Sequence, residues 1–223
     1  MQGFQINSRV RVASASLVEQ FRPIPTSNIS DVMSRTTAGG ARLRPYHDGT
    51  ILAGVAVTVR TRPGDNLMLH KAMDISGPGD VIVVDAAGDL TNSLMGEMMM
   101  NYAASRGISG FVLDGAIRDV SVIKASSMPI YAAGVTHRGP YKDGPGEINC
   151  SIAIDGMVVE PGDIIIGDED GVVCIPFDQA EAILEAALKK VEQEEQVRIA
   201  IREGKLNRSW VDATLQNRGC LPA

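Results

Sequence analysis

The sequence is poor in the residues that build disulfide frameworks, zinc sites and nucleic-acid surfaces. Its three cysteines, Cys150, Cys174 and Cys220, lie far apart and form no Cys-x-x-Cys pair, which excludes a zinc knuckle or a thioredoxin-type motif. A sparse, odd number of cysteines fits a reducing compartment. The net charge of −6 argues against a surface that follows a phosphate backbone, so we expect no nucleic-acid partner. An acidic surface that binds a basic protein stays open.

Long apolar runs and a targeting segment are also missing. No stretch approaches the ~20 residues of a membrane helix, and the first residues show no basic region followed by an apolar core. We therefore expect a cytoplasmic protein with no membrane partner. Aromatic residues make up only 4 % of the chain, whereas it has 23 glycines and 10 methionines, which favours close backbone packing over aromatic ligand cages. The 223 residues are enough for one domain and few for two, so we expect a single domain over residues 1–223.

The chain alternates short apolar runs with segments of helical spacing. Residues 54–60, 81–84 and 111–113 are rich in β-branched or bulky apolar side chains and predict strands, and residues 130–175 are strand-rich with several turns. This alternation of helices with strands indicates an α/β layered domain. Helices are expected at 26–35 (capped by Thr26, Ser27 or Asn28), 66–75, 94–106 (ending at Gly107) and 178–203 (with a capping box of Asp178 and Glu181, ending at Gly204).

A tripeptide recurs before two of the expected strands. Pro78-Gly79-Asp80 and Pro161-Gly162-Asp163 each precede a run of valine or isoleucine. Both patterns predict a tight turn that leads into a buried strand. Two similar turns explain this repeated motif more simply than an internal duplication does.

The strongest candidate for chemistry is the segment 96–119. Gly96 and Glu97 are expected at the start of a helix, and Arg118 and Asp119 follow a buried strand. Ligands of α/β proteins bind beyond the carboxyl ends of strands, where helix N-termini offer free N–H donors to anions. Arg118 would then stabilise an anion beside a metal ligand, Asp119. The alternative is a solvent-facing Arg–Asp turn.

A second candidate group is Asp65, Asn66 and His70. Asp65 or Asn66 could simply cap the following helix, and His70 could be an ordinary half-buried histidine. His47 and His137 have no metal-ligand spacing with it, which sets a structural zinc site aside. No Gly-x-Ser-x-Gly, Walker loop or Gly-x-Gly-x-x-Gly after a strand is present, which excludes the common hydrolase and nucleotide-binding motifs.

Glu194 interrupts a largely apolar face of the last helix. The face is formed at helical spacing by Ile183, Ala187, Lys190, Glu194, Val197 and Ile201. A carboxylate there needs a partner or a role. The simpler explanation is a local pair with Arg198, four residues on.

The order of these motifs resembles the RraA-like family over about residues 20–205. The motifs that carry the resemblance are Ser30-Asp31, Pro63-Gly64-Asp65-Asn66 with His70, Gly96-Glu97-Met98-Met99, Gly107-Ile-Ser-Gly110, Leu113-Asp114-Gly115-Ala116-Ile117-Arg118-Asp119, Arg138-Gly139-Pro140, Gly144-Pro145-Gly146, Pro161-Gly162-Asp163 and Asp168-Glu-Asp-Gly171. The family includes 4-hydroxy-4-methyl-2-oxoglutarate aldolases, 4-carboxy-4-hydroxy-2-oxoadipate aldolases and the RNase E inhibitor that named it. The resemblance implies a compact α/β/β/α-type domain that assembles as homotrimers or hexamers, with active sites between chains.

The resemblance also implies roles for individual residues. Asp119 would bind a divalent metal, Mg²⁺ or Mn²⁺, and Arg118 would contact the carbonyl oxygen of a small 2-oxo acid substrate. Glu97 would hold a metal-bound water, and the backbone after Gly96, at Met98 and Met99, would receive the substrate carboxylate. Lys142 of the same chain, together with Glu194 from the last helix of a neighbouring chain, would complete a site to which Asp65, Asn66 and His70 contribute substrate contacts.

Together these residues predict a metal-dependent carbon–carbon lyase that releases pyruvate from a 4-hydroxy-2-oxo acid and decarboxylates oxaloacetate through the same enolate. The chain departs from the aldolases at Val122, where they carry Asp or Glu, which favours another substrate or a decarboxylase. Two other classes stay open. One is a protein-binding regulator of an RNase. The other is a methyltransferase, for which no glycine-rich S-adenosylmethionine loop is visible.

Overall fold

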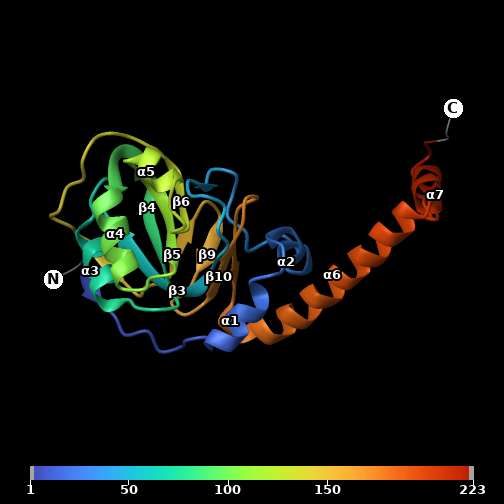
Figure 1. Ribbon diagram of the computed structural model, residues 1–223, viewed down its shortest axis with the longest axis horizontal. Coiled ribbons are helices and arrows are strands. Elements are labelled where there is room, and N and C mark those ends of the chain that lie inside the picture. The colour runs from blue at the N-terminus through green and yellow to red at the C-terminus, as the bar shows by residue number, and fades with distance from the viewer. Residues whose placement is uncertain (1–2, 221–223) are drawn as a thin grey trace. The chain divides into compact units, whose positions relative to one another are not determined.

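A computed structural model describes residues 3–220. The contacts within the chain group it into two compact units, Met1–Ala187 and Leu188–Ala223. The first unit carries the sheet and the hydrophobic core, and the second consists of the C-terminal part of one long helix and a short final helix (Figure 1). In the described part of the chain, no helix combines the length and the apolar character that crossing a membrane requires.

The observed elements alternate as an α/β protein requires. In chain order they are β1 (Phe4–Ile6), α1 (Ala15–Phe21), α2 (Thr26–Val32), β2 (Arg44–Pro45), β3 (Leu52–Thr61), α3 (Leu67–Ile75), β4 (Asp80–Met95), α4 (Glu97–Ser105), β5 (Gly110–Ile117), α5 (Val120–Lys124), β6 (Ile130–Val135), β7 (Gly146–Ile148), β8 (Ile152–Ile154), β9 (Met157–Val159), β10 (Ile164–Gly167), β11 (Val172–Ile175), the 3-10 turn η1 (Phe177–Gln179), α6 (Ala180–Arg202) and α7 (Ser209–Asn217).

The main sheet has the order β1-β7-β3-β4-β5-β6-β2, and β10, which pairs with β11, also pairs with β3. Its centre, β3 to β6, is parallel. Parallel strands connected through helices are covered on both faces, which explains why these strands are nearly continuous runs of buried side chains. Because they run the same way, β4 and β5 bring their carboxyl ends, Met95 and Ile117, to one edge of the sheet.

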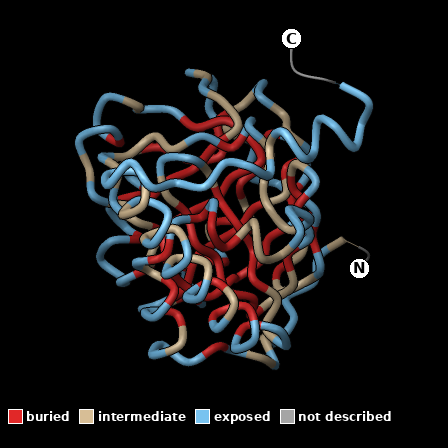
Figure 2. Tube along the Cα trace, turned by 90° about the vertical axis from the view of Figure 1, so that its right-hand side faces the viewer, coloured by how far each residue is buried: buried red, intermediate tan, exposed pale blue. Residues whose placement is uncertain are grey.

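The core lies on both faces of this sheet. Alternate residues of each strand point to opposite faces: Ile82 and Val84 pack with the residues of α3 and α4, whereas Val81 and Val83 pack with the β8–β9 hairpin. Figure 1 shows α3, α4 and α5 covering one face and strands lying over the other, and Figure 2 shows buried residues concentrated in the interior. The structure therefore confirms the expected layered α/β fold.

The helix expected over residues 94–106 was wrong at its start. Strand β4 continues to Met95, and α4 begins only at Glu97, with Gly96 as its N-cap. The second half of β4 pairs with β5 through several register shifts, and Leu94 and Met95 are buried in this strand. The bulges interrupt the alternation of side chains that identifies a strand, so the sequence pattern does not reveal this part of β4. The expected end of the helix is confirmed, because Gly107 follows the C-cap with a φ of +73°.

The start of α2 is capped by a residue far away in sequence. Its N-cap is Pro25, which has no side-chain cap, and the carboxylate of Asp168 accepts from the Thr26 backbone N–H at 2.9 Å and from its hydroxyl at 2.7 Å. The expectation that Thr26, Ser27 or Asn28 caps this helix was therefore wrong. At the other end of the chain, the long final helix is confirmed as α6, Gly204 follows it with a φ of +66°, and α7 was not expected.

Three Pro-Gly-Asp turns each bury their aspartate. The Asp80 carboxylate accepts from the Gly77 N–H at 3.0 Å, and the Asp163 carboxylate accepts from the Glu160 N–H at 2.9 Å, so both reach three residues back. Their strands lie on opposite sides of Val55 in β3, one parallel and one antiparallel. The similarity seen in the sequence is thus confirmed for the turns. The third aspartate, Asp65, reaches forward, as described below.

Candidate active site

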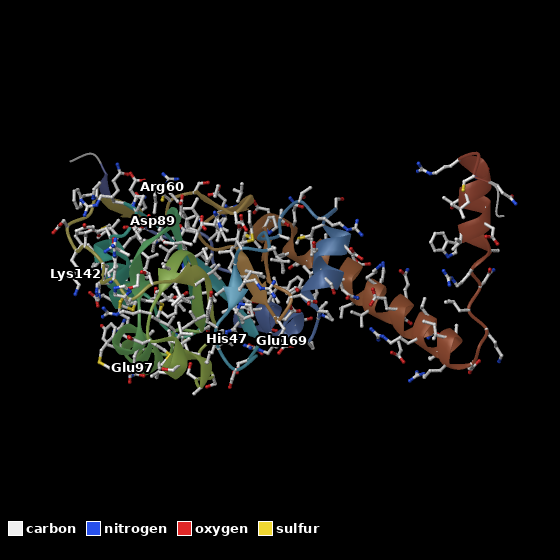
Figure 3. The ribbon with its side chains drawn as sticks, turned by 90° about the horizontal axis from the view of Figure 1, so that it is seen from above. His47, Arg60, Asp89, Glu97, Lys142 and Glu169 are labelled. Carbon is white, nitrogen blue, oxygen red and sulfur yellow. The ribbon has the colours of Figure 1, made fainter. Side chains whose placement is uncertain are left out.

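A cavity of about 250 Å³ opens beyond the carboxyl ends of β4 and β5. This is the edge at which α/β sheets bind ligands. Eight residues predicted from the sequence lie in its wall together with four that were not, and the wall consists of Asn66, His70, Ser93, Leu94, Met95, Gly96, Met98, Met99, Arg118, Asp119, Pro140 and Lys142. In Figure 3, Glu97 and Lys142 lie toward the end of the first unit away from His47 and Glu169.

Asp119 is held in an uncommon backbone conformation. Its φ is +56°, in the left-handed region where non-glycine residues are rare. Its carboxylate Oδ2 accepts a hydrogen bond of 3.0 Å from the backbone N–H of Glu97 at the start of α4. A Cβ on Gly96 would overlap this Oδ2 and lie 2.9 Å from Arg118 Cγ. Glycine is therefore required at residue 96 so that the Arg118-Asp119 turn can approach the helix.

Arg118 lies beside this carboxylate and reaches into the cavity. Its Nε is 3.7 Å from Asp119 Oδ2, and its side chain is 45 % exposed, so the guanidinium is available to a ligand. Its backbone is held by a 3.0 Å hydrogen bond from its N–H to the Met95 carbonyl. A Cβ on Gly139 would lie 3.4 Å from Nη1, so the absence of a side chain there leaves that end of the fork open. An open, fixed fork is suited to a carboxylate or an enolate oxygen.

The N-terminus of α4 supplies backbone donors to the same cavity. Met98 and Met99 are the second and third residues of this nine-residue helix and line the cavity. The first N–H groups of a helix have no partner within the helix, and the helix dipole favours an anion there. The predicted carboxylate site at Met98 and Met99 is therefore geometrically reasonable. The Glu97 N–H is already engaged by Asp119.

His70 and Lys142 line the same cavity. Burial lowers the pKa of His70, and the positive charge of Lys142 lowers it further, while Asp74 opposes both effects. His70 is thus neutral at pH 7, and Lys142 is the second positive charge of the cavity after Arg118. Asn66 packs beside them, with its Nδ2 donating to the Leu94 carbonyl at 2.8 Å.

Three predicted site residues are placed differently. Asp65 was expected to contact substrate, but it is fully buried behind the cavity and its carboxylate binds backbone N–H groups. The backbone of Glu97 supports Asp119, whereas its side chain is not part of the described cavity wall. Glu194 lies in the second unit, where its carboxylate is 3.7 Å from the Lys190 ammonium and 3.5 Å from Arg198 Nη2. The local pair with Arg198 is confirmed, and the contribution of Glu194 to a neighbouring site stays a prediction.

The donor set of the cavity suits a hard cation with few protein ligands. Asp119 is the one carboxylate in the described wall, and within residues 3–220 no three His, Cys, Asp or Glu side chains gather as a metal cluster. Mg²⁺ prefers oxygen and keeps several waters, so one partly exposed carboxylate is an adequate anchor for it, whereas zinc sites use three or four protein ligands. The residues present fit a weakly held Mg²⁺ or Mn²⁺ at Asp119.

Some residues at this edge were missed from the sequence. Ser93, Leu94 and Met95 line the cavity because β4 extends farther than expected. A second, open cavity of about 320 Å³ shares Arg118 and Asp119 and is also lined by His137. Larger cavities occur elsewhere, one of about 430 Å³ near Arg22 and one of about 410 Å³ near Arg9 and Asp80, but neither of these lies at the carboxyl ends of β4 and β5.

Comparison with known proteins agrees with this geometry. The family model described as RraA-like, Aldolase/RraA, matches residues 26–174, which include every residue of the cavity wall. The chain belongs to the RraA-like family. A relative from Halalkalibacterium halodurans, provisionally named 4-hydroxy-4-methyl-2-oxoglutarate aldolase, is 43 % identical over 183 residues, which are 82 % of this chain and 87 % of the relative.

Solved structures agree on the fold of this RraA-like chain. The RNA-processing inhibitor RraA of Thermus thermophilus is 28 % identical, has a TM-score of 0.63, and is matched over 92 % of its length and 68 % of this chain. An uncharacterized protein of Pseudomonas syringae is 24 % identical with a TM-score of 0.78, over 96 % of its length and 88 % of this chain. The family thus includes both a relative with an aldolase name and a regulator of RNA processing.

Proposed function

We propose that this RraA-like chain is a divalent-metal-dependent lyase that releases pyruvate from a 4-hydroxy-2-oxo acid such as 4-hydroxy-4-methyl-2-oxoglutarate. Decarboxylation of oxaloacetate is proposed as a second activity, because it produces the same pyruvate enolate. The observation that carries the proposal is the convergence of Arg118, Asp119 and the N-terminus of α4 on one cavity. The aldolase name of the relative from Halalkalibacterium halodurans supports it.

The proposed reaction assigns a separate task to each wall of the cavity. The N–H groups of Met98 and Met99 bind the C1 carboxylate of the substrate, and Lys142 binds an anionic group at the far wall. Arg118 meets the 2-oxo oxygen, where negative charge grows as the bond between C3 and C4 breaks. A cation at Asp119 would supply Lewis-acid stabilisation of that charge. No Schiff-base lysine is needed.

The C4 hydroxyl must lose its proton as the bond breaks. We propose that an ordered water accepts this proton and returns it to C3 of the enolate, which gives pyruvate, and that Glu97, or Glu194 from a neighbouring copy, orients the water. A role for Glu194 requires a homotrimer or a hexamer whose sites lie between chains, whereas Glu97 belongs to the same chain as Arg118 and Asp119. Val122, which is 38 % exposed, adds no charge near Asp119, so the proposed metal affinity depends on one carboxylate.

The decisive experiment measures pyruvate release from a panel of 4-hydroxy-2-oxo acids and from oxaloacetate. The protein is first treated with a chelator and then assayed with and without Mg²⁺. Because Mg²⁺ itself promotes oxaloacetate decarboxylation, an equal amount of the Arg118→Ala variant provides the background rate. We expect turnover that needs both the metal and Arg118. No pyruvate above background from any substrate would refute the proposed function.

A regulator of RNA processing is the alternative function. It is favoured by the 28 % identity to the RNA-processing inhibitor RraA of Thermus thermophilus. A regulator of this kind needs an intact assembly and no metal-dependent turnover. The same assay therefore separates the two functions, provided that light scattering shows the protein to be assembled.

A further inference from the structure

Asp65 is a buried carboxylate with four hydrogen-bond donors around it. Its Oδ2 accepts from the Asp143 N–H at 2.8 Å, the Gly144 N–H at 2.9 Å and the Arg62 guanidinium at 3.0 Å. Its Oδ1 accepts from the Leu67 N–H at 2.9 Å. With 0 % of the residue exposed, this carboxylate has no free face for a substrate.

These donors come from two segments that meet at the cavity. Leu67 is the first residue of α3, the helix that carries His70. Asp143 and Gly144 directly follow Lys142 in the loop after β6. One carboxylate thus joins the start of α3 to the segment that presents Lys142, and both segments contribute a residue to the cavity wall.

The residue before Lys142 is fixed as well. The Asn66 N–H donates to the Tyr141 carbonyl at 3.0 Å, and the Tyr141 N–H donates to the Gly64 carbonyl at 2.9 Å. Lys142 is therefore held between two tied neighbours, although its own side chain is exposed. A flexible lysine whose backbone is fixed on both sides searches a small volume, which lowers the entropy lost when it binds an anion.

Arg62 supports the same loop from the solvent side. Its guanidinium balances the buried charge of Asp65, lies 5.4 Å from the ring centroid of Tyr141 and is 3.7 Å from the Asp143 carboxylate. A buried carboxylate is stable when its charge is paired and its oxygens accept hydrogen bonds, and both conditions hold for Asp65. Asp65 and Arg62 therefore form a clamp around residues 141–144.

We propose that Asp65 is a positioning residue that fixes Lys142 in the cavity wall that also contains Arg118 and His70, so that the ammonium group binds an anionic group of the substrate. Asp65 acts only through Lys142 and does not touch the substrate. The anion is a carboxylate of a 2-oxo acid if the proposed function is right, and to that extent the inference rests on it.

A double-mutant cycle tests the proposal with the full chain. Asp65→Asn keeps the shape of the side chain, but its NH₂ group cannot accept hydrogen bonds and must face either the Leu67 N–H or the N–H groups of Asp143 and Gly144. The hydrogen bonds to one of these two segments are therefore lost. We expect Asp65→Asn to lower kcat/KM for pyruvate release about tenfold, mainly through KM, because misplacing a binding group by 1 Å can cost up to ~10² in rate. In a Lys142→Met background, Asp65→Asn should have no further effect, because residues that act through one another are not additive.

Asp163→Asn is the matched control. Asp163 is also the buried aspartate of a Pro-Gly-Asp turn, and its carboxylate accepts two backbone N–H groups at 2.9 Å, but it is not part of the cavity wall. This substitution should lower the melting temperature about as much as Asp65→Asn and leave kcat/KM unchanged. If Asp65→Asn does not fold, Arg62→Ala loosens the same loop from its exposed side and replaces it in the cycle.

Titration of His70 by NMR provides a readout that does not need activity. Lys142→Met should raise the pKa of His70, because the charge of Lys142 lowers it in the native protein. Asp65→Asn should raise it in the same direction, and Asp163→Asn should not change it. The positioning role would be overturned if Asp65→Asn and Lys142→Met lowered kcat/KM independently, so that their losses multiply. It would also be overturned if the pKa of His70 did not change in Asp65→Asn. The expected His70 shifts in a protein that releases no pyruvate would keep this role and reject the proposed function.

Discussion

Replacing Gly96 by alanine tests the geometry of the site with a single carbon atom. The backbone at Gly96 has φ −155° and ψ −162°, an extended conformation that alanine adopts freely. The added Cβ would overlap Asp119 Oδ2 and lie 3.1 Å from Asp119 Cγ, so the carboxylate must leave its position. Its hydrogen bond with the Glu97 N–H would break, and Arg118, whose Cγ lies 2.9 Å from the new atom, would be displaced as well.

The size of the effect follows from this displacement. A carbon and an oxygen that are not bonded need more than about 3 Å, so the carboxylate must move by roughly 1 Å, and a misplacement of that size can cost ~10²-fold in rate. We expect kcat/KM to fall about 100-fold, which corresponds to about 2.7 kcal/mol of barrier. Stability should change less, by about 1 kcal/mol, because the Asp119 side chain is 41 % exposed and can turn toward water.

The assay compares pyruvate release by Gly96→Ala with that by Gly77→Ala. Gly77 is the matched control, because an added Cβ there would meet no atom within 4 Å. The melting temperature of each variant is recorded to show that it is folded, and a change of about 2–4 °C is expected for Gly96→Ala. If Gly96→Ala keeps kcat/KM within twofold of the native protein, the contact between Gly96 and Asp119 has no role in catalysis, and the site has been assigned wrongly.

Four further results are expected. Arg118→Ala should lower kcat about 10²–10³-fold and Arg118→Lys somewhat less, because lysine keeps the charge and loses the fork; losses within twofold for both pyruvate release and decarboxylation would favour the regulator. Chelation or Asp119→Asn should abolish turnover, and Mg²⁺ or Mn²⁺ should restore it only to the chelated native protein; full activity after thorough chelation excludes the metal. Light scattering should show a trimer or hexamer, with Glu194→Gln lowering turnover at unchanged mass; a fully active monomer excludes shared sites. Burial raises the pKa of the Asp114 carboxyl group, while Arg42 opposes this rise. Because this pKa is higher in the folded protein than in the unfolded chain, the carboxyl group contributes stability below its ordinary pKa, and the contribution is lost as the pH rises through the folded-state pKa. The difference in unfolding free energy between the native protein and Asp114→Asn, measured in urea, should therefore shrink as pH rises; growth with pH would mean that the Arg42 ion pair dominates.

Much of the fold could be predicted from local patterns. The cores of β3, β4 and β5 are runs of β-branched or bulky apolar residues, and the ends of α4 and α6 are marked by Gly107 and Gly204. What the sequence hid depends on partners far along the chain. The cap of α2 comes from Asp168, 142 residues away, and β4 continues to Met95 only because bulges let it follow β5. Neither feature has a period or spacing that a local pattern can reveal.

The candidate site shows the same division. Gly96, Arg118 and Asp119 could be found because a helix start and a strand end bring them together, and the family resemblance named them. The role of Asp65 could not be read in this way, because its partners at residues 143 and 144 are known only from the fold. Its motif made it look like a ligand contact, although the carboxylate is fully buried and is not part of the cavity wall. Residues in the second unit, including Glu194, are known only through their local pairs.

The three Pro-Gly-Asp turns have a consequence for the interpretation of genetic variants. Substitution of Asp80 removes a turn hydrogen bond and the ion pair with Arg9, and substitution of Asp163 removes hydrogen bonds from Glu160 and Phe177. None of these partners is part of the cavity wall, so either substitution should mainly reduce the amount of folded protein that a cell accumulates. Substitution of Asp65 should also impair each molecule that does fold, because its bonds reach the loop beside the cavity. A growth selection would give similar scores to substitutions of all three aspartates, because it does not distinguish a loss of folded protein from a loss of activity. Measuring protein abundance alongside growth would separate them, even though the tripeptide that contains them is the same.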